Sequence, residues 1–131
     1  MHLDFAELDK IYDAGRTTVY GGLTLPGGRK AVVKTIRDAF PSRRLIRGLR
    51  QEQRLLESLN APGIIKSYGL VSQDGWLALL IEDFGGVSLA TACRGRRLNL
   101  DTFLEVAIGV ADALASVHEA GIIHKDVSPG N

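Results

Sequence analysis

An aspartate and an asparagine near the end of this 131-residue chain have side chains and spacing suited to phosphoryl transfer. They lie in the run from His124 to Asn131 (HKDVSPGN), in which Asn131 follows Asp126 by five positions. A carboxylate can accept the proton of an attacking hydroxyl, and an amide oxygen can ligate the metal of Mg-ATP. The same run also fits a polar surface loop after a helix, so whether it indicates phosphoryl transfer depends on the residues upstream.

A lysine and a glutamate in the first half of the chain form a second candidate group. Lys34 ends the short apolar run 31–33, which is typical of a strand, and Glu52 follows 18 positions later in a segment with helical spacing. Each also has an ordinary interpretation, since Lys34 fits a solvated strand end and Glu52 fits a solvated partner of Arg54. Glu57 competes with Glu52 as the partner of the lysine.

Periodicity and turn signals predict the strands and helices that carry these residues. A hairpin is predicted over 17–36, around Pro26-Gly27-Gly28, and a helix over 42–59, where leucines recur opposite a face of arginines. The other predictions are a first strand over 4–13, strands over 64–71 and 76–83, a short helix over 88–94, and a helix over 102–119 capped by Asp101. The fold class is therefore α+β.

In this order the chain resembles the protein kinase superfamily over essentially its whole length. The resemblance implies that residues 1–84 are the N-terminal lobe, an antiparallel sheet with one helix, followed by the hinge. Residues 85–131 would begin a helical C-terminal lobe that is truncated. The implied activity is that of a protein serine/threonine kinase domain, which transfers the γ-phosphate of ATP to a protein hydroxyl with the help of Mg²⁺.

The resemblance also implies a role for each candidate residue. Asp126 would accept the proton of the substrate hydroxyl, and Asn131 would ligate the metal. Lys34 would bind the α and β phosphates, and Glu52 would hold Lys34 in place. The implied ATP-binding residues are Lys34, Val19, Ala31, Ile81 as the gatekeeper, and Glu82 and Phe84 through their backbone groups.

Three segments carry a narrower resemblance. Residues 11–20, 82–86 and 124–131 are similar to the N-terminal kinase domain of very large bacterial sensor proteins. In those proteins a P-loop ATPase module, a GAF sensor and a histidine kinase follow the kinase-like domain. We therefore expect such further domains in a parent chain that works in signal transduction, with a protein as its substrate.

The chain departs from the kinase pattern at several positions. Tyr12, Ala14 and Thr17 stand at the three glycine positions of the phosphate-covering loop, and only Gly15 lies nearby. The hydroxyls of Thr17 and Thr18 are candidates to replace part of the lost phosphate contact.

Two further departures lie in the polar loop, where Lys125 replaces an arginine and Ser128 replaces a lysine. The departures leave a pseudokinase-like docking module as an alternative. The end of the loop, residues 129–131, is also similar to that of small-molecule phosphotransferases such as aminoglycoside and choline kinases.

Composition excludes several other classes of protein. Lys plus Arg number 16 and Asp plus Glu 15, and the net charge of +1 argues against a nucleic-acid partner. Cys93 is the single cysteine, which excludes a disulfide framework within the chain and fits a reducing compartment. Charged residues interrupt the apolar stretch 106–123, and residues 1–9 lack the pattern of a signal peptide. We therefore expect no membrane segment and a cytoplasmic location.

The sequence stops at Asn131, before the metal-binding Asp-Phe-Gly triplet of kinases. From this we expect a piece of a longer kinase, and we expect the 131-residue chain to be inactive by itself.

Overall fold

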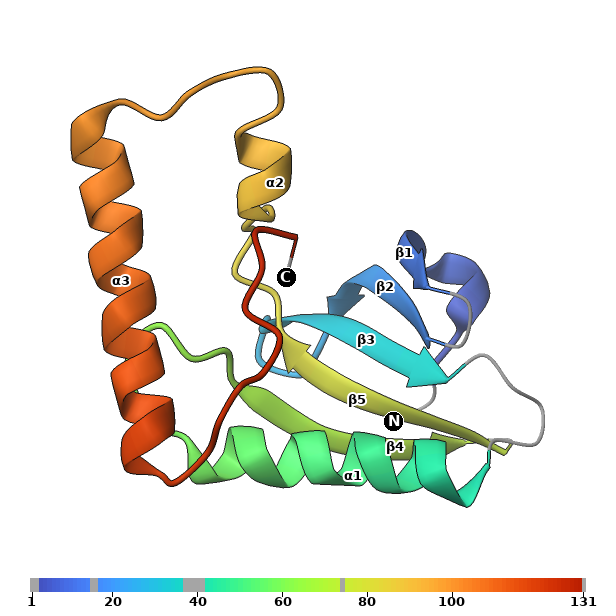
Figure 1. The fold of residues 1–131 in the computed structure, drawn as a ribbon. Coiled ribbons are helices and arrows are strands. Elements are labelled where there is room, and N and C mark those ends of the chain that lie inside the picture. The colour runs from blue at the N-terminus through green and yellow to red at the C-terminus, as the bar shows by residue number, and fades with distance from the viewer. Residues whose placement is uncertain (1–2, 15–16, 37–41, 74, 131) are drawn as a thin grey trace. The chain divides into compact units, whose positions relative to one another are not determined.

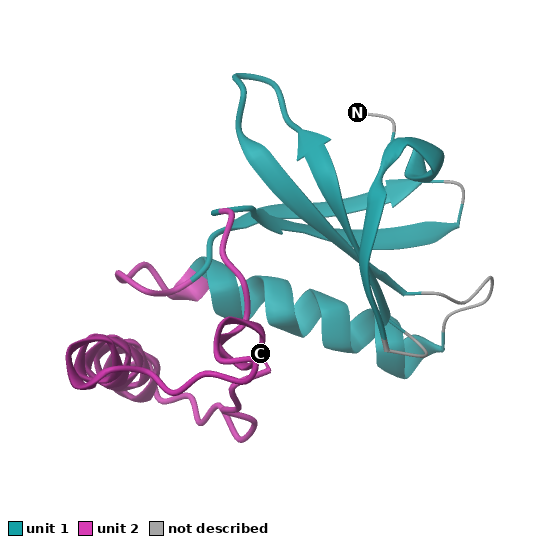
Figure 2. Ribbon diagram, turned by 90° about the horizontal axis from the view of Figure 1, so that it is seen from above, with its two compact units in different colours: residues 1–57, 65–84 teal, residues 58–64, 85–131 magenta. Residues whose placement is uncertain are grey.

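The computed structural model of the chain describes residues 3–14, 17–36, 42–73 and 75–130 (Figure 1). Its elements in chain order are η1 (Phe5–Glu7), β1 (Asp9–Ala14), β2 (Thr17–Thr24), β3 (Lys30–Ile36), α1 (Arg43–Ser58), β4 (Ser67–Gln73), β5 (Trp76–Glu82), α2 (Leu89–Ala92) and α3 (Leu100–Glu119). They fall into two units, Met1–Glu57 with Ile65–Phe84 and Ser58–Ile64 with Gly85–Asn131 (Figure 2). We call these unit 1 and unit 2 and describe each by itself.

Unit 1 is a five-stranded antiparallel sheet with the helix α1. The strand order is β1-β2-β3-β5-β4, and every neighbouring pair is antiparallel. The hairpin predicted over 17–36 is present as β2 and β3. Gly27 and Gly28 form its turn with φ of +82° and +78°, a conformation that residues with a Cβ rarely adopt.

The two faces of the sheet bury different apolar clusters. One cluster contains Ala31, Val33 and Leu80, which are almost completely buried. The other contains Leu79 and Leu49, and Leu49 comes from α1. Side chains alternate between the faces of a strand, so β3 contributes to both clusters. Each fully buried leucine stabilises the fold by about 1.5–3 kcal/mol.

Helix α1 agrees with the helix predicted over 42–59. The hydroxyl of Ser42 accepts a hydrogen bond from the backbone N–H of Leu45 at 3.4 Å, which supports the first turn. Pro41, which the sequence places just before this helix, lies outside the described residues. The helix ends at Ser58, ahead of Pro62, as expected for a residue that cannot continue a helix.

Two predicted strands begin later than expected. The first was expected from residue 4, but β1 begins at Asp9. Instead, the carboxylate of Asp4 accepts a hydrogen bond from the backbone N–H of Ala6 at 3.0 Å and caps the short helix η1. Strand β4 begins at Ser67 rather than at residue 64, and it then runs to Gln73.

Unit 2 contains the helices α2 and α3 and the polar loop after them. The short helix α2 is capped by Ser88 and covers four residues, fewer than the range 88–94 predicts. Helix α3 begins two residues earlier than predicted, and its cap is Asn99 instead of Asp101. The side chain of Asn99 accepts a hydrogen bond from the backbone N–H of Thr102 at 2.8 Å. No helix in the described part of the chain is long and apolar enough to cross a membrane.

Candidate functional site

The strongest feature of unit 1 is an ion pair between β3 and α1. The Lys34 ammonium donates hydrogen bonds to both carboxylate oxygens of Glu52, with distances of 2.7 Å to Oε1 and 2.8 Å to Oε2. The side chains are 31% and 37% exposed, so the pair lies at the edge of the core with one side open to solvent. The pairing predicted from the sequence is confirmed.

The orientation of α1 decides between the two candidate glutamates. Leu49 is buried against the sheet, and Glu52 follows it by three positions, on the same side of the helix. Glu57 is about 140° farther around the helix. It is exposed, and its carboxylate accepts a hydrogen bond from the side-chain amide of Gln53 at 2.6 Å. The packing of α1 against the sheet therefore makes Glu52, and not Glu57, the ion-pair partner of Lys34.

The register of the sheet brings three apolar residues to the face that carries Lys34. Val19 on β2 lies directly opposite Lys34, and Val32 on β3 lies directly opposite Ile81 on β5. Directly opposite residues project to the same face of a sheet, and Val32 shares the face of Lys34 because it is two positions away. All three valine and isoleucine side chains are half-buried. A cation beside an apolar surface of this kind suits a ligand that has phosphates and an aromatic ring.

The structure does not bring Ala31 into this group. Ala31 is adjacent in sequence to Val32, so it projects to the opposite face of the sheet. It is 0% exposed and packs in the cluster of Leu25 and Val33. The residue that the sequence analysis missed is Val32. The period of two along a strand, counted back from Lys34, was the signal that could have identified it.

The last residue of β5 and the residue after it are fixed to their neighbours through their backbone. The N–H of Glu82 donates to the carbonyl of Lys66 at 2.9 Å, and the N–H of Asp83 donates to the carbonyl of Lys30 at 3.1 Å. A ligand that binds the backbone of Glu82 can therefore use only its carbonyl. Phe84 follows with a side chain that is 73% exposed.

Thr17 and Thr18, which follow the glycine positions of the phosphate-covering loop, differ in their burial. Thr17 is half-buried, whereas Thr18 is 1% exposed and lies opposite Thr35 in the β2–β3 pairing. The Thr18 side chain alternates with that of Val19, so it projects to the face that does not carry Lys34. The expectation that the Thr18 hydroxyl contacts a phosphate is therefore wrong. Gly15 lies outside the described residues.

The polar loop of unit 2 has a defined backbone. The carbonyl of Pro129 accepts a hydrogen bond from the N–H of Ala90 in α2 at 2.7 Å, which ties the loop to that helix. Lys125 has φ of +63°, and it is the single non-glycine residue with positive φ in the described ranges. Such a conformation is costly for a residue with a Cβ and is found frequently at functional sites.

Asp126 follows this turn with an exposed side chain, and its N–H donates to Nδ1 of His124 at 3.2 Å. The proposed metal ligand Asn131 lies outside the described residues. Within the described residues, no three His, Cys, Asp or Glu side chains gather into a metal-binding group.

The protein kinase domain family matches residues 6–131 of the chain. Among curated proteins, the chain is 34% identical over 107 residues to the serine/threonine-protein kinase PkaB of Streptomyces coelicolor, covering 81% of this chain and 26% of that protein. It is 30% identical over 116 residues to the MAP kinase kinase kinase SSK2 of Saccharomyces cerevisiae, covering 86% of this chain and 7% of that protein. The chain thus spans about a quarter or less of the length of these two relatives.

The fold is similar to that of a solved kinase domain. The PknI kinase domain of Mycobacterium tuberculosis, solved as a point mutant, superposes with a TM-score of 0.72 at 22% sequence identity. The similarity covers 94% of this chain and 51% of that one. It confirms the predicted α+β fold, and the family match confirms the predicted superfamily. The chain belongs to the protein kinase domain family.

Proposed function

We propose that this chain is the first part of a protein serine/threonine kinase domain that transfers the γ-phosphate of ATP to a protein hydroxyl. The observation that carries the proposal is the ion pair in which Glu52 holds Lys34 with both carboxylate oxygens. In phosphoryl transfer the protein contributes mainly positioning and charge stabilisation, and a lysine held by a carboxylate supplies both.

Within unit 1, Lys34 binds the α and β phosphates, and Glu52 keeps its ammonium at one place. Val19, Val32 and Ile81 contact the adenine and ribose from the same face of the sheet, with Val32 in the role first expected of Ala31. The backbone carbonyl of Glu82 and the backbone of Phe84 bind the adenine edge. The support for this arrangement is the sheet register, in which Val19, Val32 and Ile81 project to the face that carries Lys34.

Within unit 2, Asp126 orients the substrate hydroxyl and accepts its proton, and Asn131 ligates Mg²⁺ through its amide oxygen. The left-handed turn at Lys125 and the bond from Ala90 to Pro129 hold the loop that carries Asp126. When bound, Mg²⁺ neutralises part of the negative charge on the phosphates. Protein kinases in general use ATP and a divalent metal, and the hard oxygen donors of this loop fit such an ion.

We also propose that residues 1–84 form the N-terminal lobe with its hinge and that residues 85–131 begin the C-terminal lobe. The division of the chain at Phe84 and Gly85 supports this assignment, apart from residues 58–64, which group with unit 2. A parent chain with sensor, ATPase and histidine kinase domains, a protein substrate and a cytoplasmic location remain predictions from the sequence.

The test uses a natural protein that contains this domain. Asp126→Ala is expected to lower kcat for phosphorylation of a protein substrate by at least a hundredfold, because general-base catalysis contributes about 10²–10⁴-fold. The affinity for ATP should stay within about twofold, since Asp126 contacts the hydroxyl and not the nucleotide. Asp101→Ala is the matched control, because Asp101 is an exposed carboxylate of the same unit. An Asp126→Ala protein that works at the wild-type rate would overturn the proposal.

A second candidate function is a pseudokinase-like docking module. It is favoured by Tyr12, Ala14 and Thr17 at the glycine positions and by Ser128 at the position of a lysine. Glycine lets backbone N–H groups approach phosphates, and a lysine at the loop would stabilise the transferring phosphoryl group. Titration of the containing protein with an ATP analogue, with and without Mg²⁺, separates the two functions. A docking module binds no nucleotide in a metal-dependent way, and its signalling survives Asp126→Ala.

A further inference from the structure

The outer face of α1 carries a dense row of positive charge. Helix α1 contains five arginines and two glutamates, and Lys34 neutralises one of the two glutamates, Glu52. The formal charge of the helix is +3, whereas that of the whole chain is +1, so the rest of the chain carries −2. The net positive charge of the chain therefore comes from this helix.

Four of these arginines follow one side of the helix. Arg43, Arg47, Arg50 and Arg54 are spaced by four, three and four positions, which places them within an arc of about 60° along roughly 16 Å of the helix. We call these four residues the arginine row. Glu52 is about 180° around the helix from Arg43, so the row lies opposite the side that holds Lys34. Binding to the row and pairing with Lys34 therefore use different sides of one helix.

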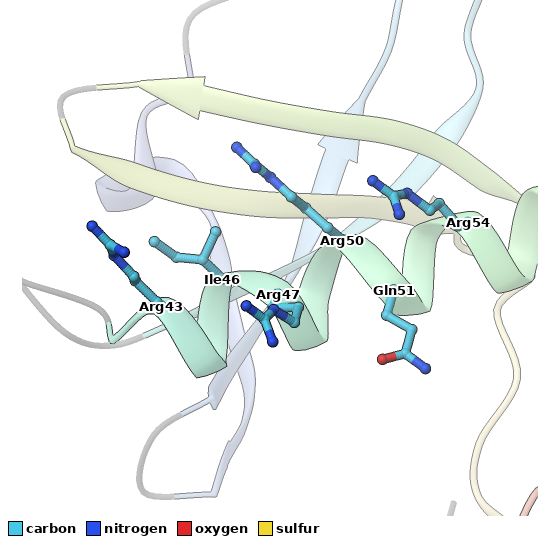
Figure 3. A pocket seen from close by; sticks show the side chains of 6 residues that line it. All are labelled: Arg43, Ile46, Arg47, Arg50, Gln51 and Arg54. Atoms are coloured by element: carbon cyan, nitrogen blue, oxygen red, sulfur yellow. The ribbon is translucent and has the colours of Figure 1, made fainter.

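The arginine row lines an open hollow on the surface of α1. The hollow has a volume of about 630 Å³, and its lining consists of the arginine row, Ile46 and Gln51. Figure 3 shows Arg43, Ile46, Arg50 and Arg54 extending to one side of the helix, Gln51 extending to the other, and Arg47 lying in front of the helix between them. None of the residues proposed to bind ATP lines it. The hollow is thus a separate surface, with arginine ends around the half-buried side chain of Ile46.

No carboxylate in the described ranges forms an ion pair with the arginine row. The ion pairs there join Lys10 to Asp13 and Lys34 to Glu52. All four arginine side chains are exposed. Four like charges on one helix face repel each other, and like charges four positions apart destabilise a helix by a few tenths of a kcal/mol per pair. An anionic partner would remove this repulsion.

The composition of the row favours carboxylates on a protein over other anions. Every cation in it is an arginine, and a guanidinium binds a carboxylate with two parallel hydrogen bonds. The hollow contains no aromatic side chain on which a nucleobase could stack. Ile46 is its single apolar residue, too little for insertion into a membrane surface. The four-three-four spacing matches the contact line between two packed helices.

We propose that the outer face of α1 is a docking site for an acidic helical segment of a partner protein, with Asp or Glu residues repeated at intervals of three and four. The carboxylates pair with the arginine row, and an apolar residue between them contacts Ile46. This proposal goes beyond the kinase activity and does not depend on it, because the site uses none of the residues assigned to ATP, metal or substrate hydroxyl.

The test is fluorescence anisotropy on the 131-residue chain with a labelled helical peptide that has glutamates at four-three-four spacing. The same peptide with glutamine in place of each glutamate is the ligand control. The variant R47Q/R50Q/R54Q should bind the acidic peptide at least tenfold more weakly, because it loses three charge-assisted contacts. The matched protein control is R94Q/R96Q/R97Q, which removes the same charge from exposed arginines of unit 2 and should change affinity less than twofold.

Three outcomes would overturn the proposal. Failure of the wild-type chain to bind the acidic peptide does so, and so does an equal loss of affinity in both triple variants, which indicates unspecific charge attraction. Tighter, row-dependent binding of a DNA oligonucleotide of equal charge, or of phosphatidylserine vesicles, identifies a different class of partner. Should circular dichroism show that R47Q/R50Q/R54Q is unfolded, R47K/R50K/R54K replaces it. That variant keeps the charge but loses the bidentate hydrogen bonding of the guanidinium groups, so it should still bind the acidic peptide more weakly than wild type.

Discussion

Glu52 reaches Lys34 from the middle of α1, 18 positions along the chain, and offers both carboxylate oxygens to one ammonium group. The two side chains are about one third exposed. Ion pairs with this degree of exposure contribute about 0–1 kcal/mol to stability. The pair is therefore better explained by the placement of a cation than by stabilisation of the fold.

Replacing Glu52 by Gln should distinguish a role in positioning the Lys34 ammonium from a role in stabilising the fold. Glu52→Gln is expected to change the free energy of unfolding by less than about 1 kcal/mol. It should lower kcat/KM of a kinase containing this domain roughly tenfold or more, because Lys34 loses a charge-assisted partner. Chemical denaturation and steady-state kinetics measure the two effects. Glu57→Gln is the control, since Glu57 lies on the same helix and its carboxylate accepts a hydrogen bond from Gln53. Equal kinetic losses in both variants would contradict the assignment of Glu52 as the residue that positions Lys34.

Substitution of Ala31 should mainly affect stability, whereas substitution of Val32 should mainly affect nucleotide binding. Ala31→Leu places a larger side chain in a fully buried position and should destabilise the protein by about 1–3 kcal/mol. Val32→Ala removes a half-buried side chain from the face of Lys34 and should weaken binding of an ATP analogue several-fold, with a smaller loss of stability. Thermal unfolding and analogue titration of a protein containing the domain check both. If the Val32→Ala protein bound the ATP analogue with wild-type affinity, the proposal that Val32 contacts the nucleotide would be wrong.

The cap of α3 can be tested in the 131-residue chain itself. Asn99→Ala should lower the free energy of unfolding by about 0.5–2 kcal/mol, because the Thr102 N–H loses its side-chain acceptor. Asp101→Ala is the comparison, since the sequence suggests Asp101 as the cap. It lies in the first turn and should cost only about 0.3–1 kcal/mol through the helix dipole. A larger loss in Asp101→Ala would restore the original expectation.

Helix α3 carries apolar side chains that face solvent, and this should cause self-association of the 131-residue chain. Phe103, Leu104 and Ile108 are 54%, 45% and 59% exposed. Exposed apolar side chains grouped on one helix promote contacts between molecules. Sedimentation velocity should show concentration-dependent association, and L104Q/I108Q should reduce it. A monomeric wild-type chain at about 100 μM, well above typical micromolar affinities, would contradict this prediction.

The strands and helices whose signals are local could be predicted from the amino-acid sequence alone. The turn at Pro26-Gly27-Gly28 and the β-branched runs beside it specify the β2–β3 hairpin, because glycine tolerates the positive φ that the turn requires. The leucine spacing specifies α1 in the same way. The resemblance to kinases then identified Lys34 and Asp126 as candidates, because both lie within recognisable runs of neighbouring residues.

Where several residues are equivalent in their local sequence, the folded chain was needed to distinguish them. Glu52 and Glu57 are both acceptable on α1, and only the burial of Leu49 against the sheet turns Glu52 toward Lys34. Asn99 and Asp101 are both good caps, and the choice depends on where the chain enters α3. Ala31 and Val32 are neighbours in one apolar run, and the pairing of β3 with β2 and β5 sets which one shares a face with Lys34. For the two glutamates and for the two neighbours on β3, the deciding contact is with a residue distant in the sequence, which no local pattern specifies.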